Sequence, residues 1–504
     1  MDGEAVGAAR SSGQGSAASR SPTIAILGAG AAGLCMGIQL KKAGISSFTI
    51  FEKSERLGGT WFDNHYPGAG CDVPSHLYCF SFEPNPNWSR KFSLQPEIRD
   101  YLDHCAVKYG LMKHIRFRTE IASASFDERH GVWRLRTTTG EELCAQVLVS
   151  ATGQLNRPYV PKLLGLDTFQ GTTFHSARWN HDRDLAGARV AVIGNGASAI
   201  QFVPCIASVA REVTVFQRSA NYVVPRFDRA FKPWEKWIFR NLPLALKLYR
   251  ASLYWRLEAR FFAFFRDSWF SKKLREAALS YLNQSVSDPA LAEELTPDYP
   301  IGCKRILISD DYYQSLMRPN VELVTESITG VTRRGVVTAD GTERASDVIV
   351  FATGFETTSF LAPTQLEGLG GRKLAEEWRS GAEAYLGVAL SGYPNFFLLY
   401  GPNTNLGHNS IIFMIECQVS YVLQCIHRLM RPDLLYLDVR REAMDRYNAE
   451  VQGAIGKTAW SAGCHSWYKT ESGKVTNNWS GFTVEFWWKT RRPDWAAYEF
   501  VLRA

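Results

Sequence analysis

The sequence predicts an α/β fold with two Rossmann-like domains and a helical insertion in the second of them. Three observations point to this fold. A glycine-rich turn follows a short apolar segment near residue 28, and the same arrangement returns near residue 194. An aromatic and strongly basic stretch then occupies residues 226–275. A chain of 504 residues has room for about three domains of ordinary size.

Composition is that of a globular protein, with 45% hydrophobic and 21% charged residues. The ten cysteines show no CxxC or zinc-finger spacing. We therefore expect reduced thiols in a reducing, cytoplasmic compartment, with neither a metal site nor a redox disulfide. Residues 1–21, mostly Gly, Ala and Ser, are predicted to form a disordered tail.

Charge and hydropathy limit the partners. The net charge of +7 is modest and no nucleic-acid motif is present, so we expect no nucleic-acid partner. The longest uncharged stretch, residues 384–415, is broken by Pro394 and Pro402. No transmembrane helix is therefore predicted.

The first glycine-rich turn has the context of a dinucleotide site. An apolar strand at 23–27 leads into it, a helical pattern follows, and a second strand ends at Glu52. Glycines let the backbone approach a pyrophosphate at the helix N-terminus. Glu52, 24 residues after Gly28, can accept hydrogen bonds from ribose hydroxyls and repels a 2′-phosphate. The unit suits FAD or NAD, with these candidate contacts: Gly28, Gly30, Ala31, Gly33 and Glu52.

The second turn reverses the charge at the corresponding position. Strands are predicted at 189–193 and 212–216, and Arg218 lies 24 residues after Gly194. A fixed cation beside the Ser219 hydroxyl suits a 2′-phosphate, so NADPH is favoured over NADH. The two units together predict a flavoprotein that a nicotinamide reduces. The candidate NADPH contacts are Gly194, Asn195, Gly196, Ala197, Ser198, Gln201, Arg218 and Ser219.

These patterns divide the chain. Residues 22–155 are expected to form the first part of the FAD-binding domain, and 156–225 with 276–350 the NADP-binding domain. Residues 351–504 would hold the second part of the FAD-binding domain and a C-terminal region.

The insertion, residues 226–275, holds 13 Lys or Arg against 4 Asp or Glu, and 14 aromatic residues that include Trp234, Trp237, Trp255 and Trp269. One interpretation is an amphipathic face for peripheral contact with a membrane surface. The other is a helical subdomain that packs its aromatics inside and exposes its cations. The second interpretation is favoured.

Two longer motifs carry a family resemblance. Residues 58–72 read GGTWFDNHYPGAGCD, and residues 169–179 match F-x-G-x-x-x-H-x-x-x-W and end at Trp179. On these motifs the chain resembles Baeyer–Villiger monooxygenases. Ala-Thr-Gly at 151–153 and 352–354 resembles the hinges between the FAD and NADP domains of that superfamily.

The resemblance implies an activity. NADPH would reduce FAD, and the reduced flavin would add O2 to form a C4a-peroxyflavin that attacks a small-molecule ketone. The resulting Criegee adduct would rearrange to an ester or lactone. A permanently charged arginine suits such a site, because it cannot protonate and quench the peroxide.

The resemblance also assigns roles. Gly302-Cys303-Lys304-Arg305 matches the family's K-R segment, so Arg305 would stabilise the peroxide and the adduct, Asp72 would orient Arg305, and Lys304 would contact the NADPH phosphate. His175 is expected to be structural rather than catalytic. Residues 401–408 resemble the flavin-adjacent loop. Further flavin contacts would be Gly59, Thr60, Trp61, Asp63, Asp72, Tyr78 and Ile121.

Three other functions share part of this pattern. A flavin monooxygenase that oxidises amines or sulfides would use the same cofactors but would need no adduct-stabilising arginine. A disulfide reductase needs a redox cysteine pair, and none has the required spacing. A non-enzymatic flavoprotein, such as a redox sensor or a membrane-associated module built on the insertion, is disfavoured by the intact motifs.

Overall fold

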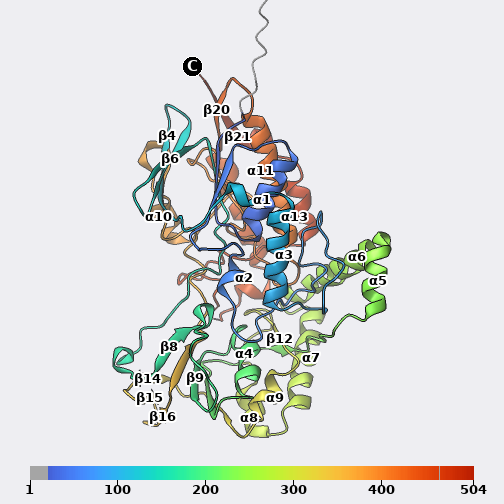
Figure 1. Ribbon diagram of the computed structural model, residues 1–504, viewed down its shortest axis with the longest axis vertical. Helices are drawn as coiled ribbons and strands as arrows, with labels where there is room; N and C mark the ends of the chain where they lie inside the picture. Colours follow the sequence, from blue (N-terminus) through green and yellow to red (C-terminus); the bar gives the residue numbers. More distant parts are fainter. Residues whose placement is uncertain (1–20, 465, 504) are drawn as a thin grey trace, which may run out of the picture.

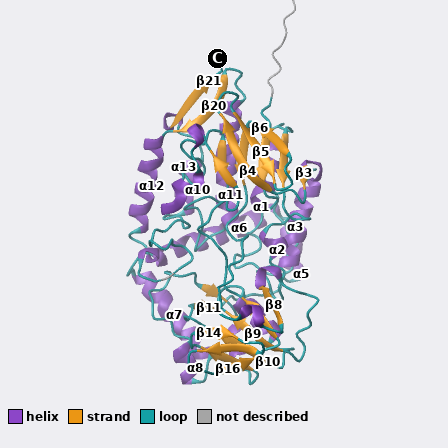
Figure 2. Cartoon of the chain, turned by 90° about the vertical axis from the view of Figure 1, so that its left-hand side faces the viewer, coloured by secondary structure: helices purple, strands orange, loops and turns teal. Residues whose placement is uncertain are grey.

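The computed structural model describes residues 21–464 and 466–503. The predicted tail therefore lies, apart from its last residue, outside the described residues. Figure 1 shows an elongated molecule with two lobes, and Figure 2 shows that each lobe contains strands at its outer end. The predicted α/β class with two Rossmann-type sheets is confirmed.

The upper lobe is built on a parallel sheet with the order β19-β7-β1-β2-β3. These strands are short and apolar, as expected for strands covered on both faces. Strand β19 comes from far along the chain, so the C-terminal part returns to complete the first domain. The strands are β1 (Ile24–Leu27), β2 (Phe48–Phe51), β3 (Ile115–Arg116), β7 (Val147–Ser150) and β19 (Phe396–Leu398).

Helices and a small sheet complete this lobe. Helix α1 packs against both α3 and α11. A four-stranded sheet, β18-β4-β5-β6, lies beside the main one. The helices are α1 (Ala31–Lys42), α2 (Thr60–Asp63), α3 (Gln95–Lys108), α10 (Leu374–Glu377), α11 (Ile411–Leu429), α12 (Arg441–Ile455) and α13 (Thr483–Thr490). The further strands are β4 (Ile121–Asp127), β5 (Val132–Thr137), β6 (Glu142–Ala145), β18 (Gln365–Glu367), β20 (Leu434–Val439) and β21 (Tyr498–Leu502).

The lower lobe repeats the design with a parallel sheet of order β13-β10-β9-β17-β8. Its strands are β8 (Thr172–His175), β9 (Arg189–Ile193), β10 (Glu212–Phe216), β13 (Val321–Val324) and β17 (Val348–Phe351). Smaller strands are β11 (Val223–Val224), β12 (Leu307–Ile308), β14 (Ile328–Val331), β15 (Gly335–Thr338) and β16 (Glu343–Ala345). Its helices are α4 (Ala199–Ile206), α8 (Pro289–Glu294) and α9 (Tyr312–Leu316).

The basic aromatic stretch forms helices α5 (Pro233–Asn241) and α6 (Pro243–Ala259), and it reaches into α7 (Trp269–Ser285). Helices α5 and α6 project from one side of the molecule (Figure 1). The favoured interpretation, in which the aromatic residues pack inside, holds only in part: Phe231, Phe261 and Phe264 are buried, but the four tryptophans are not. Trp234, Trp237, Trp255 and Trp269 are 58%, 61%, 59% and 64% exposed. On α6 the buried positions are held by Leu246, Leu253 and Leu257, so Trp255 lies on the outer side.

Candidate functional site

A cavity opens where the first glycine-rich turn meets the C-terminal ends of β1 and β2. Its walls come from the β1–α1 turn, the end of β2, helix α2, the segment after β7 and the start of α11. Of the residues predicted to hold the flavin, the following line it: Gly28, Gly30, Ala31, Glu52, Gly59, Thr60, Trp61, Asp63, Tyr78 and Ile121.

The first glycine turn packs on the hinge that follows β7. Gly28 has a φ of +103°, and a Cβ built there would lie 2.7 Å from the carbonyl oxygen of Ala151. A Cβ at Gly33 would overlap the Gly28 carbonyl, so Gly33 serves the packing of α1 on its own turn. The turn therefore has no room for a side chain at Gly28 or Gly33, and α1 begins at the cavity wall.

Glu52 is buried and fixed. Its carboxylate accepts hydrogen bonds from the backbone N–H of Ala29 at 2.7 Å and of Ser54 at 2.8 Å. A buried carboxylate needs such donors. These two bonds hold a negative charge at the place where the ribose of a dinucleotide lies in Rossmann units.

The second glycine turn packs on the second hinge in the same way. Gly194 has a φ of +104°, and a Cβ there would lie 2.6 Å from the carbonyl oxygen of Ala352. Asn195 Nδ2 donates to Gln217 Oε1 at 2.7 Å and to the Ser219 carbonyl at 3.0 Å, so it closes the turn onto the end of β10. A Cβ at Gly196 would meet no atom within 4 Å, which leaves this part of the turn open.

Two cations and a hydroxyl gather beyond β10. Lys304 Nζ donates to Ser219 Oγ at 2.7 Å. Burial lowers the pKa of Lys304, and the positive charge of Arg218 lowers it further. An anion bound between Lys304 and Arg218 would relieve this repulsion.

Gln201, predicted to contact NADPH, has its amide engaged elsewhere. Its Oε1 accepts from the Tyr66 hydroxyl at 3.0 Å and from the Gly70 N–H at 3.2 Å, and its Nε2 donates to the Gly70 carbonyl at 3.0 Å. Gln201 thus joins α4 of the second unit to the 58–72 segment of the first. The other turn residues, Ala197 and Ser198, lie between Gly196 and the first residue of α4.

Arg305 and Asp72 meet although 233 residues separate them. Arg305 Nε donates to Asp72 Oδ2 at 3.1 Å, and Nη2 donates to the same oxygen. Burial would raise the pKa of Asp72, but the Arg305 guanidinium outweighs it and the net pKa lies below its ordinary value. Asp72 in turn raises the pKa of Arg305. The pair is therefore ionised.

Two tyrosines beside this pair were missed. Tyr400 lines the flavin cavity and donates from its hydroxyl to Asn405 Oδ1 at 2.6 Å. Tyr468 is buried, and the positive charge of Arg305 acts against the burial that raises its pKa to about 12. Tyr400 directly precedes the 401–408 loop, so its place could have been inferred. Tyr468 lies in the C-terminal region, where no motif pointed to it.

His175 and Asp63 connect the motif at residues 169–179 to neighbouring parts of the chain. His175 Nδ1 accepts from the Ala177 N–H at 3.0 Å, its ring contacts Phe355, and burial lowers its pKa to about 4. These contacts agree with a structural role beside the second hinge. Asp63, at the cavity, pairs with Arg178 at 3.0 Å, yet burial still raises its pKa.

The expectation that all ten cysteines are reduced is wrong. Cys303 and Cys464 form a disulfide with a Cα–Cα separation of 6.3 Å. Spacing rules did not find this pair because 161 residues separate its members, and only the fold brings them together. The bond fastens the segment that carries Lys304 and Arg305 to the C-terminal region near Tyr468.

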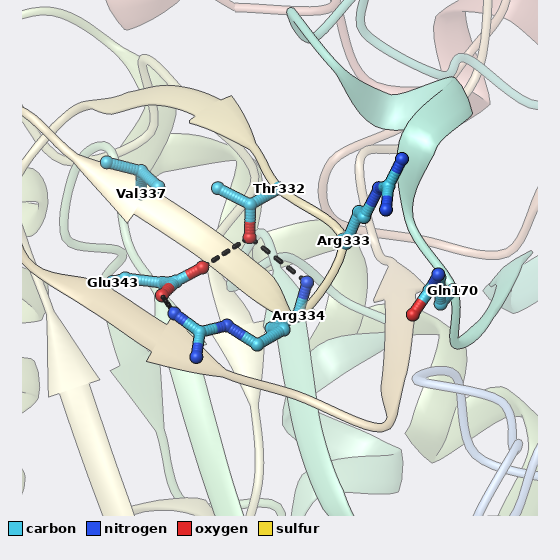
Figure 3. A pocket seen from close by; sticks show the side chains of 6 residues that line it. All are labelled: Gln170, Thr332, Arg333, Arg334, Val337 and Glu343. Carbon is cyan, nitrogen blue, oxygen red and sulfur yellow. Dashed lines mark hydrogen bonds and ion pairs between the residues drawn. The ribbon is translucent and has the colours of Figure 1, made fainter.

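Figure 3 shows a second hollow, on the small sheet β14–β15–β16. Three of its polar residues satisfy one another: Thr332 Oγ1 donates to Glu343, and Arg334 Nη2 donates to Glu343 Oε2 at 2.6 Å. None of the predicted site residues lines it. The chemistry therefore centres on the flavin cavity and the Arg305–Asp72 pair.

Comparison with known proteins gives concordant relatives. The family model Flavin-binding monooxygenase-like matches residues 21–366. A Baeyer-Villiger monooxygenase of Pseudomonas aeruginosa is 44% identical over 487 residues, which cover 96% of this chain and 92% of the relative. A Baeyer-Villiger monooxygenase of Streptomyces coelicolor is 45% identical over 482 residues, covering 95% and 92%.

Solved structures agree over nearly the whole chain. An oxidised steroid monooxygenase bound to NADP superposes with a TM-score of 0.85 at 32% identity, covering 96% of this chain and 100% of that one. A complex of OTEMO with FAD and NADP gives 0.87 at 28% identity and the same coverage. The closed form of cyclohexanone monooxygenase gives 0.83 at 27% identity, covering 95% and 99%.

Proposed function

The chain belongs to the flavin-binding monooxygenase-like family, and from this premise we propose that it is a Baeyer–Villiger monooxygenase. It uses NADPH and O2 to convert a small-molecule ketone to an ester or lactone. The observation that carries the proposal is the ion pair between Arg305 of the second nucleotide unit and Asp72 of the first. This pair places a fixed positive charge between the two units.

FAD fits the first cavity. Side chains are excluded at Gly28, α1 begins at the wall, and Glu52 lies in the position that accepts from a ribose. When bound, the flavin takes a hydride from NADPH and activates O2. The protein has to position the two cofactors, exclude water and stabilise negative charge.

Arg305 performs the last of these tasks. Its guanidinium stays protonated, so it stabilises negative charge that develops on oxygen during ketone oxidation without giving up a proton. Asp72 binds the Nε edge and one terminal nitrogen, which fixes the plane of the guanidinium. Tyr468 also interacts with Arg305, and the N–H groups that neither residue occupies would contact the reacting oxygen.

Arg218, Ser219 and Lys304 hold the 2′-phosphate of NADPH. Lys304 already donates to Ser219, and the repulsion between Lys304 and Arg218 is relieved by a bound dianion. Lys304 directly precedes Arg305 in the chain, so phosphate binding and the position of the catalytic arginine are mechanically linked.

Oxidation of amines or sulfides, the alternative, is not favoured. Such a reaction needs no fixed cation for an oxygen anion, and relatives at 44–45% identity are named Baeyer-Villiger monooxygenases. The test is turnover of the yellow holoenzyme with NADPH, air and a panel of cyclic, linear and aryl ketones plus one sulfide. Esters or lactones support the proposal, whereas a sulfoxide as the sole product would replace it with the alternative.

A further inference from the structure

Helices α5 and α6 and the start of α7 carry a set of apolar side chains that the fold leaves uncovered. We call this set the aromatic face. Its members are 58–68% exposed, far more than large apolar side chains in a folded protein usually are. They are Trp234, Trp237, Leu244, Leu248, Trp255 and Trp269.

Helix α6 shows that this exposure is built into the sequence. Leu246, Leu253 and Leu257 form one stripe that is buried against the body of the protein. Leu244, Leu248 and Trp255 fall on the opposite side of the same helix at 3.6 residues per turn. An ordinary surface helix is polar on its outer side. The outer apolar stripe of α6 is therefore not explained by folding.

The helix is also held firmly in place. Buried Glu258, near its C-terminal end, accepts from Asn409 Nδ2 at 2.8 Å and from Thr483 Oγ1 at 2.7 Å. These partners belong to the segment after the flavin-adjacent loop and to α13. The aromatic face is thus a fixed part of the structure.

Cations outnumber acids in residues 226–275, and most of the acids are paired. Asp267, two residues before Trp269, is the acid of this stretch that pairs with no cation among the described residues. The Glu235 carboxylate accepts hydrogen bonds from both terminal nitrogens of Arg229, and Asp228 pairs with Arg90 at 2.7 Å. Lys236 and Lys247, on α5 and α6, pair with no acid among the residues that the structure describes. The face is therefore apolar at its centre and positive around it.

We propose that the aromatic face binds a lipid bilayer surface rich in anionic lipids. Tryptophan rings favour the level of the lipid headgroups, leucines enter the acyl boundary, and lysines and arginines attract anionic headgroups. Within the described residues no helix is long and apolar enough to cross a membrane. The contact is thus peripheral, with the α5–α6 hairpin lying on the surface.

Charge complementarity selects the bilayer over another occupant. A second copy of this chain would set one cationic face against another, which is unfavourable. A nucleic acid would use the cations but would leave Leu244 and Leu248 in water. An anionic bilayer satisfies the apolar centre and the cationic surroundings together.

The test is co-sedimentation of the FAD-loaded enzyme with vesicles of phosphatidylcholine alone or with about one third phosphatidylglycerol. Binding to the anionic vesicles that weakens at high salt is expected. Trp234→Ser with Trp237→Ser should lower the apparent affinity about tenfold or more, as loss of inserted apolar area predicts. Lys236→Gln with Lys247→Gln should lower it less and reduce its salt dependence.

Matched controls keep the result interpretable. Leu164→Ser with Leu502→Ser removes exposed apolar side chains elsewhere, and Arg129→Gln removes an exposed cation elsewhere. Both should bind as the parent does, and every variant should keep NADPH turnover on a water-soluble ketone. No binding to anionic vesicles, or equal binding by the tryptophan variant, would overturn the proposal. So would a dimer in solution that the tryptophan variant splits, because the face would then be a protein interface.

Discussion

The two nucleotide units share a backbone but differ in enclosure. Gly28 and Gly194 have φ values of +103° and +104°, and each packs on the carbonyl of the alanine that opens its hinge. In the first unit Gly30 faces Gly59, and Glu52 is buried. In the second unit Gly196 faces open space and Arg218 is exposed. The same turn thus occurs once in an enclosed setting and once in an open one.

Arg305 connects the units, and removing it should have the largest effect. Arg305→Ala should lower ester formation about 10³-fold or more, because the developing oxyanion loses its fixed cation. Reduction of the flavin by NADPH should persist, since that step does not use this cation. Stopped-flow absorbance of the flavin and chromatography of the ester measure the two steps separately. Ester formation near the parent rate would remove Arg305 from catalysis.

Removing the positive charge of Arg218 from the second unit should have a smaller effect on catalysis. Arg218→Ala should raise the KM for NADPH about 10–100-fold and leave that for NADH nearly unchanged, because only NADPH carries the 2′-phosphate. Arg211→Ala, an exposed arginine just before β10, is the matched control and should change neither constant. Parallel changes for both coenzymes would place the phosphate elsewhere.

The corresponding change in the first unit should affect retention of the flavin. Glu52→Ala leaves the buried N–H group of Ala29 and the partly buried one of Ser54 without their acceptor and removes the ribose partner. We expect a cost of about 1–3 kcal/mol. The flavin-to-protein absorbance ratio after gel filtration and the Tm should both fall. Full flavin occupancy together with an unchanged Tm would show that Glu52 is dispensable.

The stability of the protein should depend on pH through His175, which lies beside the second hinge and not the first. Burial lowers the pKa of His175 to about 4, so below pH 6.5 the unfolded chain takes up a proton that the folded chain does not. Stability should therefore fall as pH drops from 6.5 to 4, by about 3 kcal/mol from this group. Denaturant titrations of His175→Asn should show a shallower acid loss. A slope equal to that of the parent would exclude His175 as its source.

Local sequence predicted what local geometry determines. The glycine turns, Glu52 and Arg218 follow from spacing within single strand–turn–helix units, and the Arg305–Asp72 contact followed from motifs. The sequence could not reveal the Cys303–Cys464 bond, because pairing across such a separation depends on the packing of the lobes. The contact between Gln201 and Gly70 could not be predicted for a related reason: the two residues lie in different units.

The insertion shows a different limit of prediction from sequence, which concerns the burial of helix faces. Aromatic and leucine residues at helical spacing predict a buried helix, but α6 has two apolar stripes and only one is covered. A sequence pattern does not say which stripe faces the protein. Tyr468 illustrates the same point in the C-terminal region, since it reaches the arginine site only through the fold.

Turnover under ¹⁸O2 tests the central claim most directly. The FAD-loaded enzyme is incubated with NADPH and a ketone of the panel under labelled oxygen. The mass of the product is then measured by mass spectrometry. The account predicts an ester or lactone that carries one ¹⁸O atom. It also predicts that Arg305→Ala forms this product about 10³-fold more slowly or worse. An unlabelled ester, or NADPH consumption that yields only hydrogen peroxide with every ketone of the panel, would contradict it.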